Sequence, residues 1–209
     1  MPKVTEEHVE ARRRQILSAA LRCFARQGFH RTTMQDIFRE SELSPGAVYS
    51  YFKSKDELIA AILTAIMSFV AETGALFSEP LPEGRLRRPG EALAVVIERY
   101  GDFELGTVVE RARIFPHLVG EQQRNPQLNA AARAALESLR AGFETLARAA
   151  QERGELDAEL DAEQFGRLAI SLLQGLLIQL GVYGEGIDID AYMRTATQLI
   201  DGQPAAVAS

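Results

Sequence analysis

Residues 31–55, RTTMQDIFRESELSPGAVYSYFKSK, predict two short helices joined by a tight turn and followed by the start of a third helix. Thr33 and Asp36 have the spacing of a capping box, so the first helix is expected to begin directly after Thr33. The apolar residues of that helix recur with helical spacing, at Met34, Ile37 and Phe38. Leu43, in the turn, is expected to fill the space between the two helices.

The second helix is the informative one, because its two faces differ. Ser44 is a suitable N-cap, and Pro45 stands at the first helical position, where its missing N–H costs nothing. Val48 and Phe52 lie four residues apart and are expected to face the protein. The other side carries small residues first and hydroxyls further along: Pro45, Gly46, Ala47, Tyr49 and Ser50, with Tyr51 at the edge. A face this small lets a helix enter the major groove of DNA, which is about 12 Å wide.

The third helix is expected to begin at Ser54, with Glu57 completing a second capping box. Lys55 lies in its first turn, where its charge would add to the free N–H groups of the helix in clamping a phosphate. The whole is a helix-turn-helix, whose second helix conventionally contacts base edges. Two capped helices around a short turn also occur in all-α proteins that never meet DNA. A helix face that meets only water would normally carry Glu and Lys. The outward face of the second helix carries small and hydroxyl-bearing residues instead, which favours DNA contact.

The same stretch resembles the DNA-binding signature of the tetracycline-repressor-type (TetR) regulators. The matching motifs are Thr32-Thr33-Met34-x-Asp36-Ile37 and Ser44-Pro45-Gly46-Ala47-Val48-Tyr49-Ser50-Tyr51-Phe52-Lys53-Ser54-Lys55-x-Glu57-Leu58. Upstream residues match the first helix of that signature, at Ile16, Ala19, Ala20, Phe24, Gly28 and Phe29. The resemblance covers residues 10–70 and holds in register across three helices. It implies an all-α homodimer with a DNA-binding head and a C-terminal domain that dimerises and binds a small effector. Most such regulators are repressors that the effector releases from DNA.

The DNA-binding roles can be assigned by residue type. Phosphates are expected to be held by hydroxyl and ammonium groups, at Thr33, Ser44, Tyr49, Tyr51 and Lys55; the roles of Thr33, Tyr49 and Lys55 also follow from the resemblance. Gly46, Ala47 and Ser50 are expected to approach base edges, and Pro45 a thymine methyl group. Because this face has few donors, we expect part of the specificity to come from DNA shape and water. A two-fold dimer predicts a near-palindromic operator with half-sites about 34–36 Å apart.

The composition is that of an ordinary soluble globular protein, with 46% hydrophobic and 25% charged residues among 209 and a net charge of −6. The charge is unevenly distributed. Residues 1–60 hold ten Lys/Arg and eight Asp/Glu, whereas the remainder hold thirteen and twenty-one. The helix-turn-helix end is therefore the relatively positive end, which is compatible with DNA contact through a small head.

The cellular compartment follows from what the sequence lacks. Cys23 is the one cysteine, which excludes an internal disulfide and suits a reducing cytoplasm; we expect it to pack in the core. No uninterrupted apolar run reaches the 18 or so residues of a membrane span, and the N-terminus has no apolar signal core. The expected location is the cytoplasm, with no membrane contact.

The predicted fold class is all-α with about nine helices in two domains. A three-helix helix-turn-helix head occupies residues 10–70, and a C-terminal effector-binding and dimerisation domain occupies 71–203. An alanine- and proline-rich tail at 204–209 is expected to be disordered. The helix that begins at Ser54 continues to about Ser78 and belongs to both domains, as a lever would. Further helices are expected at 91–102, 105–119 and 125–154, the second of them interrupted at Pro116.

Two C-terminal helices, at about 161–183 and 188–202, are the predicted homodimer interface. Residues 168–182, LAISLLQGLLIQLGV, are apolar almost all round, and a helix without a polar face needs cover on more than one side. One side would meet the core of the subunit and the other a second subunit, in a four-helix packing. The alternative is complete burial within a monomer.

An effector pocket is expected where aromatic and polar residues fall in the middle domain. The candidates are Phe69, Tyr100, Phe103, Phe115, His117, Phe143 and Gln174. The alternative is that most of them are core residues.

Other chemistries have no support in the sequence. The three histidines, His8, His30 and His117, have no partners at metal-ligand spacing, and there is no HExxH or CxxC motif. There is also no glycine-rich phosphate loop and no nucleophile elbow. We therefore expect no metal, no cofactor and no enzymatic activity.

The sequence leads to a ligand-responsive, sequence-specific transcriptional regulator, most simply a repressor. Two alternatives stay open. The first is a helix-turn-helix protein that acts mainly through a protein partner. The second is a helical protein that binds or converts a small molecule and has no operator.

Overall fold

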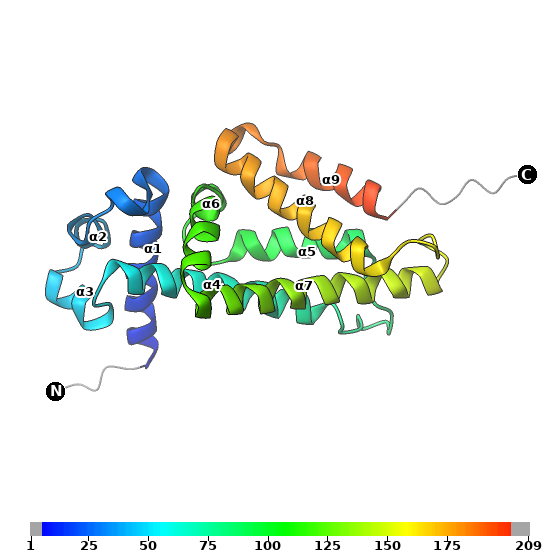
Figure 1. Cartoon of the computed structure of the whole chain (residues 1–209), viewed down its shortest axis with the longest axis horizontal. Helices are drawn as coiled ribbons and strands as arrows, with labels where there is room; N and C mark the ends of the chain where they lie inside the picture. The colour runs from blue at the N-terminus through cyan, green and yellow to red at the C-terminus, as the bar shows by residue number, and fades with distance from the viewer. Residues whose placement is uncertain (1–5, 202–209) are drawn as a thin grey trace, which may run out of the picture.

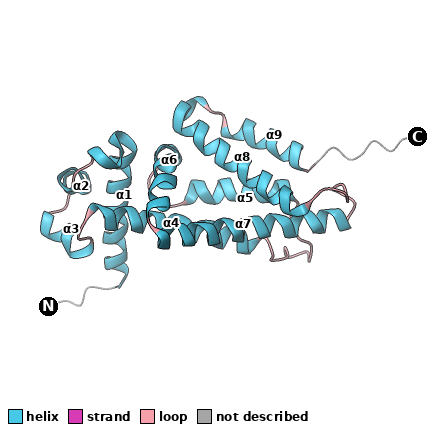
Figure 2. Cartoon of the chain, in the orientation of Figure 1, coloured by secondary structure: helices cyan, strands magenta, loops and turns pink. Residues whose placement is uncertain are grey.

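The computed structural model of the protein describes residues 6–201, and all the regular structure in that range is helical (Figure 2). The predicted all-α class is confirmed. The helices of the described range are α1 (Glu6–Arg31), α2 (Met34–Ser41), α3 (Pro45–Tyr51), α4 (Lys55–Leu76), α5 (Pro89–Asp102), α6 (Val108–Arg124), α7 (Pro126–Glu152), α8 (Ala162–Tyr183) and α9 (Ile189–Ile200), with a 3-10 turn at Gly184–Gly186. The predicted disordered tail, 204–209, lies outside the described residues.

The helices form a head and an elongated body (Figure 1). Helices α1, α2 and α3 lie together at one end, and α4 runs from them into the body beside α7. Helix α8 packs on α6 and α7, and α9 packs on α5. The start of α5, the α7–α8 loop and the end of α9 lie at the end of the body that is remote from the head.

The head begins and ends its helices where the sequence predicts. The Thr33 hydroxyl accepts from Asp36 N at 3.2 Å and the Asp36 carboxylate from Thr33 N at 2.9 Å, the predicted capping box. Ser44 caps α3 by accepting from Ala47 N, with Pro45 at the first position. The box predicted at α4 is shifted, because the Glu57 carboxylate accepts from the N–H of Lys53 rather than from that of Ser54.

Helix α1 braces the helix-turn-helix. Its helical course is broken at Gly28, whose φ of +80° no side chain tolerates easily, and Phe29 then packs edge-on against Phe24 with ring centres 4.7 Å apart. The Gln15 amide donates to Ser41 O at 2.7 Å, and Arg22 forms an ion pair with Glu40 at 2.7 Å. These contacts fix α2, and through the turn α3, against α1.

The closest helix contact in the body joins α4 to α7. A Cβ added at Gly74 would lie 2.5 Å from Leu139 N, and one added at Gly142 would lie 2.5 Å from Gly74 O. These distances are shorter than real Cβ contacts, so only glycine allows the two backbones to approach this closely. Phe77 and Phe143 pack edge-to-face beside the contact, with ring centres 5.1 Å apart.

Helix α6 differs from its prediction. It runs through Pro116 to Arg124 instead of being interrupted there. Pro116 has no N–H to donate to the carbonyl of Ala112, four residues earlier. Gly181 of α8 lies over that carbonyl, since a Cβ on Gly181 would be 3.0 Å from Ala112 O. The neighbouring helix thus covers the place where the proline removes a hydrogen bond.

Arg111 joins the body to the head. Its guanidinium is 1% exposed and donates through Nη1 to Phe103 O and Leu105 O, each at 2.9 Å, and to Gly106 O at 2.5 Å. Nη2 donates to the carbonyl of Tyr100, in the last turn of α5. The group therefore supplies a cation to the C-terminal end of α5 and holds the loop that follows it.

The loop that Arg111 holds is packed against α1. Leu105 belongs to the hydrophobic cluster of the head, together with Ile114 and Leu118 of α6. Glu104 forms an ion pair with Arg14, and a Cβ on Gly106 would be 2.6 Å from Leu21 Cδ2. The core of the head is therefore completed by residues of the body.

Helices α4 and α8 are long and apolar enough, by length and composition, to cross a membrane. Helix α4 supplies both the head cluster and the contact with α7, which accounts for its apolar sequence. Helix α8 is different, because large apolar side chains remain exposed on it: Leu168, Ile178, Val182 and Tyr183.

The α4–α7 contact predicts opposite effects for two glycine substitutions. Gly142→Ala should lower the free energy of unfolding by about 1–3 kcal/mol, because the new methyl group meets backbone atoms. Gly120→Ala is the control, since a Cβ there has nothing within 4 Å, and it should raise that free energy by about 0.5–1 kcal/mol. Urea denaturation measures both. Equal effects of the two substitutions would contradict the backbone contact.

Candidate nucleic-acid interface

The predicted DNA-binding residues lie on one outer face of the head. Thr33, Ser44, Pro45, Gly46, Tyr49 and Ser50 are exposed, whereas Ala47, Tyr51 and Lys55 are half-buried. The inner side of α3 is apolar as predicted, with Val48 at 0% and Phe52 at 3% exposure. Leu43 packs on the same cluster from the turn, where Glu42 takes a left-handed φ of 57°. The sequence therefore assigned the two faces of α3 correctly.

Most hydroxyls of this face already have partners within the head. The Thr33 hydroxyl donates to the Asp36 carboxylate at 2.8 Å, and the Ser50 hydroxyl donates to Ala47 O at 2.6 Å. Two hydrogen bonds donated by Thr33 lower the pKa of Asp36 below its ordinary value, and the bond from the Thr33 backbone N–H is the larger cause. Tyr49 is 41% exposed, and its ring packs edge-on against Phe38 with centres 5.3 Å apart. Of the predicted phosphate donors, Tyr49 is thus the one presented outward on a supported ring.

Lys55 lies in the first turn of α4, as predicted, and its ammonium group has partners inside the head. Its Nζ donates to Phe29 O at 2.6 Å and to Thr32 O at 3.0 Å, where the chain leaves α1. The ammonium therefore ties the start of α4 to the end of α1, and two of its three protons point into the head. Spacing alone did not reveal this contact, because the partners are carbonyl oxygens 23 and 26 residues away.

Lys53 is a basic residue that sequence reasoning did not assign to the interface. It is exposed between α3 and α4, and its Nζ donates to Tyr49 O at 2.5 Å, beside the predicted reading face. The signal was available, since a lysine directly after the second helix of a helix-turn-helix is placed to meet a phosphate.

Gly46 has no internal reason to be glycine. A Cβ at this position would have nothing within 4 Å, and its φ is not positive. A glycine in a helix costs stability relative to alanine. Because Gly46 has no side chain, the outer surface of α3 is recessed at its first turn, and a partner can approach the backbone there.

The predicted effector residues do not form one site. Phe69, Tyr100 and Phe103 converge, with the ring of Phe69 6.1 Å from that of Tyr100 and 5.1 Å from that of Phe103. The buried Arg111 guanidinium lies over the Tyr100 ring at 4.6 Å and the Phe103 ring at 5.6 Å, whereas Arg99 lies over the Phe69 ring at 5.6 Å. Burial raises the pKa of the Tyr100 hydroxyl to about 12.

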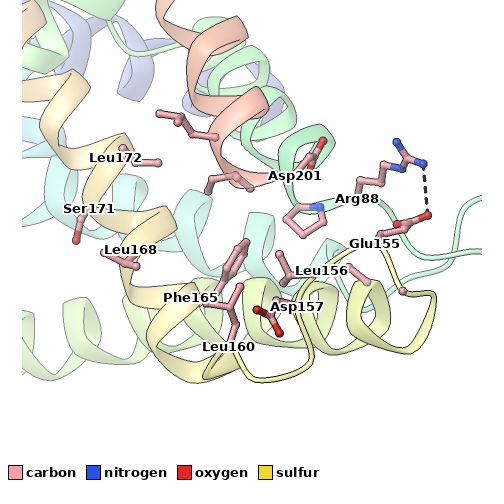
Figure 3. A pocket seen from close by; sticks show the side chains of 15 residues that line it. Arg88, Glu155, Leu156, Asp157, Leu160, Phe165, Leu168, Ser171, Leu172 and Asp201 are labelled. Atoms are coloured by element: carbon pink, nitrogen blue, oxygen red, sulfur yellow. Dashed lines mark hydrogen bonds and ion pairs between the residues drawn. The ribbon is translucent and has the colours of Figure 1, made fainter. Parts of the chain in front are cut away.

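The other four candidates lie elsewhere. Phe143 is fully buried against Phe77, and His117 is exposed with its ring 5.6 Å from that of Phe29 in the head. Phe115 and Gln174 are half-buried. A cavity of about 1090 Å³ lies instead at the remote end of the body, and none of the seven predicted residues lines it (Figure 3). Within residues 6–201 no three His, Cys, Asp or Glu side chains gather as metal ligands would.

Family comparisons cover both parts of the chain. Residues 16–62 match the N-terminal domain described as bacterial regulatory proteins, tetR family, and residues 103–205 match a tetracyclin repressor-like C-terminal domain. The transcriptional regulator UidR of Escherichia coli K12 is 27% identical over 176 residues, which span 80% of this chain and 81% of UidR. The transcriptional repressor Rv1474c of Mycobacterium tuberculosis is 45% identical over 62 residues, 30% of this chain and 33% of that protein. That match thus spans about a third of the relative's length.

Solved structures share the fold over the whole chain. GusR of Salmonella enterica superposes with a TM-score of 0.65 at 26% identity, covering 97% of this chain and 98% of GusR. FadR of Bacillus subtilis, solved in complex with stearoyl-CoA, has a TM-score of 0.66 at 18% identity and covers 90% of this chain and 97% of its own. These matches confirm the predicted arrangement of an N-terminal helix-turn-helix head and a helical C-terminal domain.

Substitutions of the two lysines next to α3 are expected to affect different quantities, one the stability and the other the DNA affinity. Lys55→Met should lower the free energy of unfolding by about 1–2 kcal/mol, since it removes two charge-assisted hydrogen bonds at the end of α1. Lys53→Met, at an exposed position, should change it by less than about 0.5 kcal/mol. It should instead weaken DNA binding on every sequence and lower the salt slope by about 1.

Urea denaturation and fluorescence anisotropy over a salt series measure the two quantities. A stable Lys55→Met variant whose DNA salt slope falls as that of Lys53→Met does would restore the predicted phosphate clamp at Lys55.

Proposed function

Because this chain belongs to the TetR family of bacterial regulatory proteins, we propose that it is a homodimeric repressor that a small molecule releases from a near-palindromic operator. It works in the cytoplasm, where its DNA is and where the free, buried thiol of Cys23 stays reduced. The relatives are regulators and not enzymes.

The observation that carries this proposal is the outer face of α3. The apolar residues of α3 point inward, while its first turn exposes Pro45 and Gly46, neither of which has a bulky side chain. A helix of this shape enters a major groove closely, and Gly46 is the position where a base edge comes nearest the backbone. Tyr49 and Lys53 lie further along the face, where they meet phosphates and fix the register.

Contact between subunits is supported by the exposed apolar face of α8. Leu168, Ile178 and Val182 are 66%, 50% and 71% exposed, and Leu199 of α9 is 73% exposed. The opposite face of α8 is buried in the body, at Phe165, Ala169, Leu173, Leu176 and Leu180. A second copy that packs α8 and α9 against their equivalents would cover this face.

The proposal of effector release is supported by the family and by the way the head is joined to the body. FadR of Bacillus subtilis, which shares this fold, was solved with stearoyl-CoA bound. In the present chain the head shares its hydrophobic cluster with α6 and with the loop held by Arg111. A ligand that shifts the body therefore changes the spacing of the two heads, and with it the fraction of dimers that fit the operator.

The operator proposal is tested by fluorescence anisotropy with DNA from upstream of the gene for this protein and with a scrambled duplex of equal length. A preference of about 10³ or more for the native fragment is expected of a specific binder. Gly46→Ala should reduce that preference without lowering stability, because the new methyl group fits the free protein but not the groove. Tyr49→Phe should weaken binding about equally on all sequences.

Equal, weak and steeply salt-dependent binding to both duplexes would leave only the nonspecific phosphate contribution, and the proposal would fail. A change of preference confined to one base position in Tyr49→Phe would contradict its phosphate role.

The dimer is expected to depend on the exposed face of α8. Ile178→Glu combined with Val182→Glu should convert it to monomers, because the dimer would bury four carboxylates, two from each subunit, without counter-ions. Multi-angle light scattering on a sizing column measures the mass. Val9→Glu is the control, since Val9 is an exposed apolar residue of α1 in the head and its substitution should leave the dimer intact. A double variant that keeps the mass of two chains would place the interface elsewhere.

A further inference from the structure

The cavity of about 1090 Å³ has no part in DNA contact. It is bounded by the start of α5, the loop between α7 and α8, the first half of α8 and the end of α9 (Figure 3). This is the end of the body remote from α3 (Figure 1). Its volume is at the upper end of the range for small-molecule sites, roughly 300–1,000 Å³.

Most of the cavity wall is apolar. The side chains that point into it are mainly leucines around one aromatic ring, at Leu156, Leu160, Leu168, Leu172 and Phe165. Phe165 comes from α8 and Leu156 from the α7–α8 loop, so the wall is assembled from separate elements. An alkyl chain or a ring system placed here would lose contact with water over much of its surface, which favours binding.

The charged residues around this wall are mostly acidic. They are one arginine, Arg88, and three carboxylates, Glu155, Asp157 and Asp201. Arg88 pairs with Glu155 at 3.4 Å, as Figure 3 shows by the dashed line. Asp157 and Asp201 form no ion pair in the part of the chain that the structure describes. Glu155 also pairs with Arg153, which does not line the cavity, at 2.9 Å, so these three carboxylates and two arginines leave one net negative charge at its edge.

Asp201 is the better placed of the two carboxylates. It is half-buried at the end of α9, and its Oδ1 accepts from Gly90 N, in the first turn of α5, at 2.7 Å. Burial raises its pKa, although the hydrogen bond from Gly90 N and the charge of Arg88 act in the opposite direction. Asp157 is exposed, and its Oδ1 accepts from Glu159 N at 2.9 Å.

We propose that this cavity binds an amphiphilic organic cation, with its apolar body among the leucines and Phe165 and its charged group at Asp201, while Asp157 adds negative charge on the other side of the lining. An apolar wall alone would accept neutral and charged amphiphiles alike. The two carboxylates without an ion pair among the described residues favour the cation over an anion of the same shape. The proposed role of this ligand as the effector rests on the regulator function proposed above, whereas its binding does not.

The cavity also opens onto the proposed subunit interface. Leu168 and Leu199 line it and are at the same time among the most exposed apolar residues of α8 and α9. A second copy seated on α8 and α9 would cover part of the opening. Occupancy and the packing of the two subunits are then linked, which gives a ligand at this end an influence on the spacing of the heads at the other.

The proposal is tested by isothermal titration calorimetry of the full chain without DNA. The probes are three ten-carbon amphiphiles below their micelle concentrations: decyltrimethylammonium, decanol and decanoate. We expect one molecule per subunit, with the cation bound about tenfold more tightly than the alcohol and the carboxylate bound most weakly. Decanoate bound as tightly as the cation, or no binding of any ten-carbon probe, would overturn the proposal.

Charge-removing variants identify the site. Asp201→Asn with Asp157→Asn keeps both backbone hydrogen bonds and removes both charges, so the preference for the cation over decanol should fall to within about threefold while decanol affinity stays unchanged. Asp190→Asn is the control, an exposed aspartate at the other end of α9, and it should keep the full preference.

A preference that survives in the double variant, or is lost in the control, would refute the assignment. Since DNA is absent from these measurements, a protein that fails to show an operator preference can still pass them, and the reverse also holds.

Discussion

The backbone contact between α4 and α7 at Gly74 and Gly142 is the constraint on which the arrangement of the two parts depends. Helix α4 belongs to both parts, with Leu58 and Ile62 in the cluster of the head and Gly74 against α7 in the body. Two helix backbones in direct contact cannot slide past one another without losing their close packing, because no flexible side chain lies between them. The far end of α4 is thus held against α7.

The second link is electrostatic. The buried cation of Arg111 satisfies carbonyls at the end of α5 and in the following loop, and that loop packs on α1 through Leu105. Its Nε has no hydrogen-bond partner among the described residues, so the site is stabilised chiefly by carbonyl dipoles and by the Tyr100 ring. The head is therefore coupled to the body at two places, the shared helix and this loop. A head joined in this way follows the body when the body changes shape.

The two proposed binding surfaces lie at opposite ends of the same helical frame (Figure 1). The operator face is on α3, while the remote cavity touches α5, α8 and α9. Helix α8 packs on α6, whose Ile114 and Leu118 complete the cluster of the head. A continuous set of packed elements thus runs from the cavity and the subunit face to the reading helix. Coupling between them needs a ligand that prefers one packing of this set over another.

The sequence by itself determined the local structure and the family. Caps at Thr33, Ser44 and Ser54, the inward Val48 and Phe52, the long α4 and the apolar α8 all follow from short-range rules of capping and periodicity. Only the tertiary structure decided what depends on distant partners. Lys55 donates to the end of α1 because folding brings those carbonyls near it, and Arg111 is buried because the α5–α6 loop closes over it. The predicted effector residues lie in separate places for the same reason. Spacing along one helix says which side chains share a face, but which faces enclose a cavity depends on how separate helices pack.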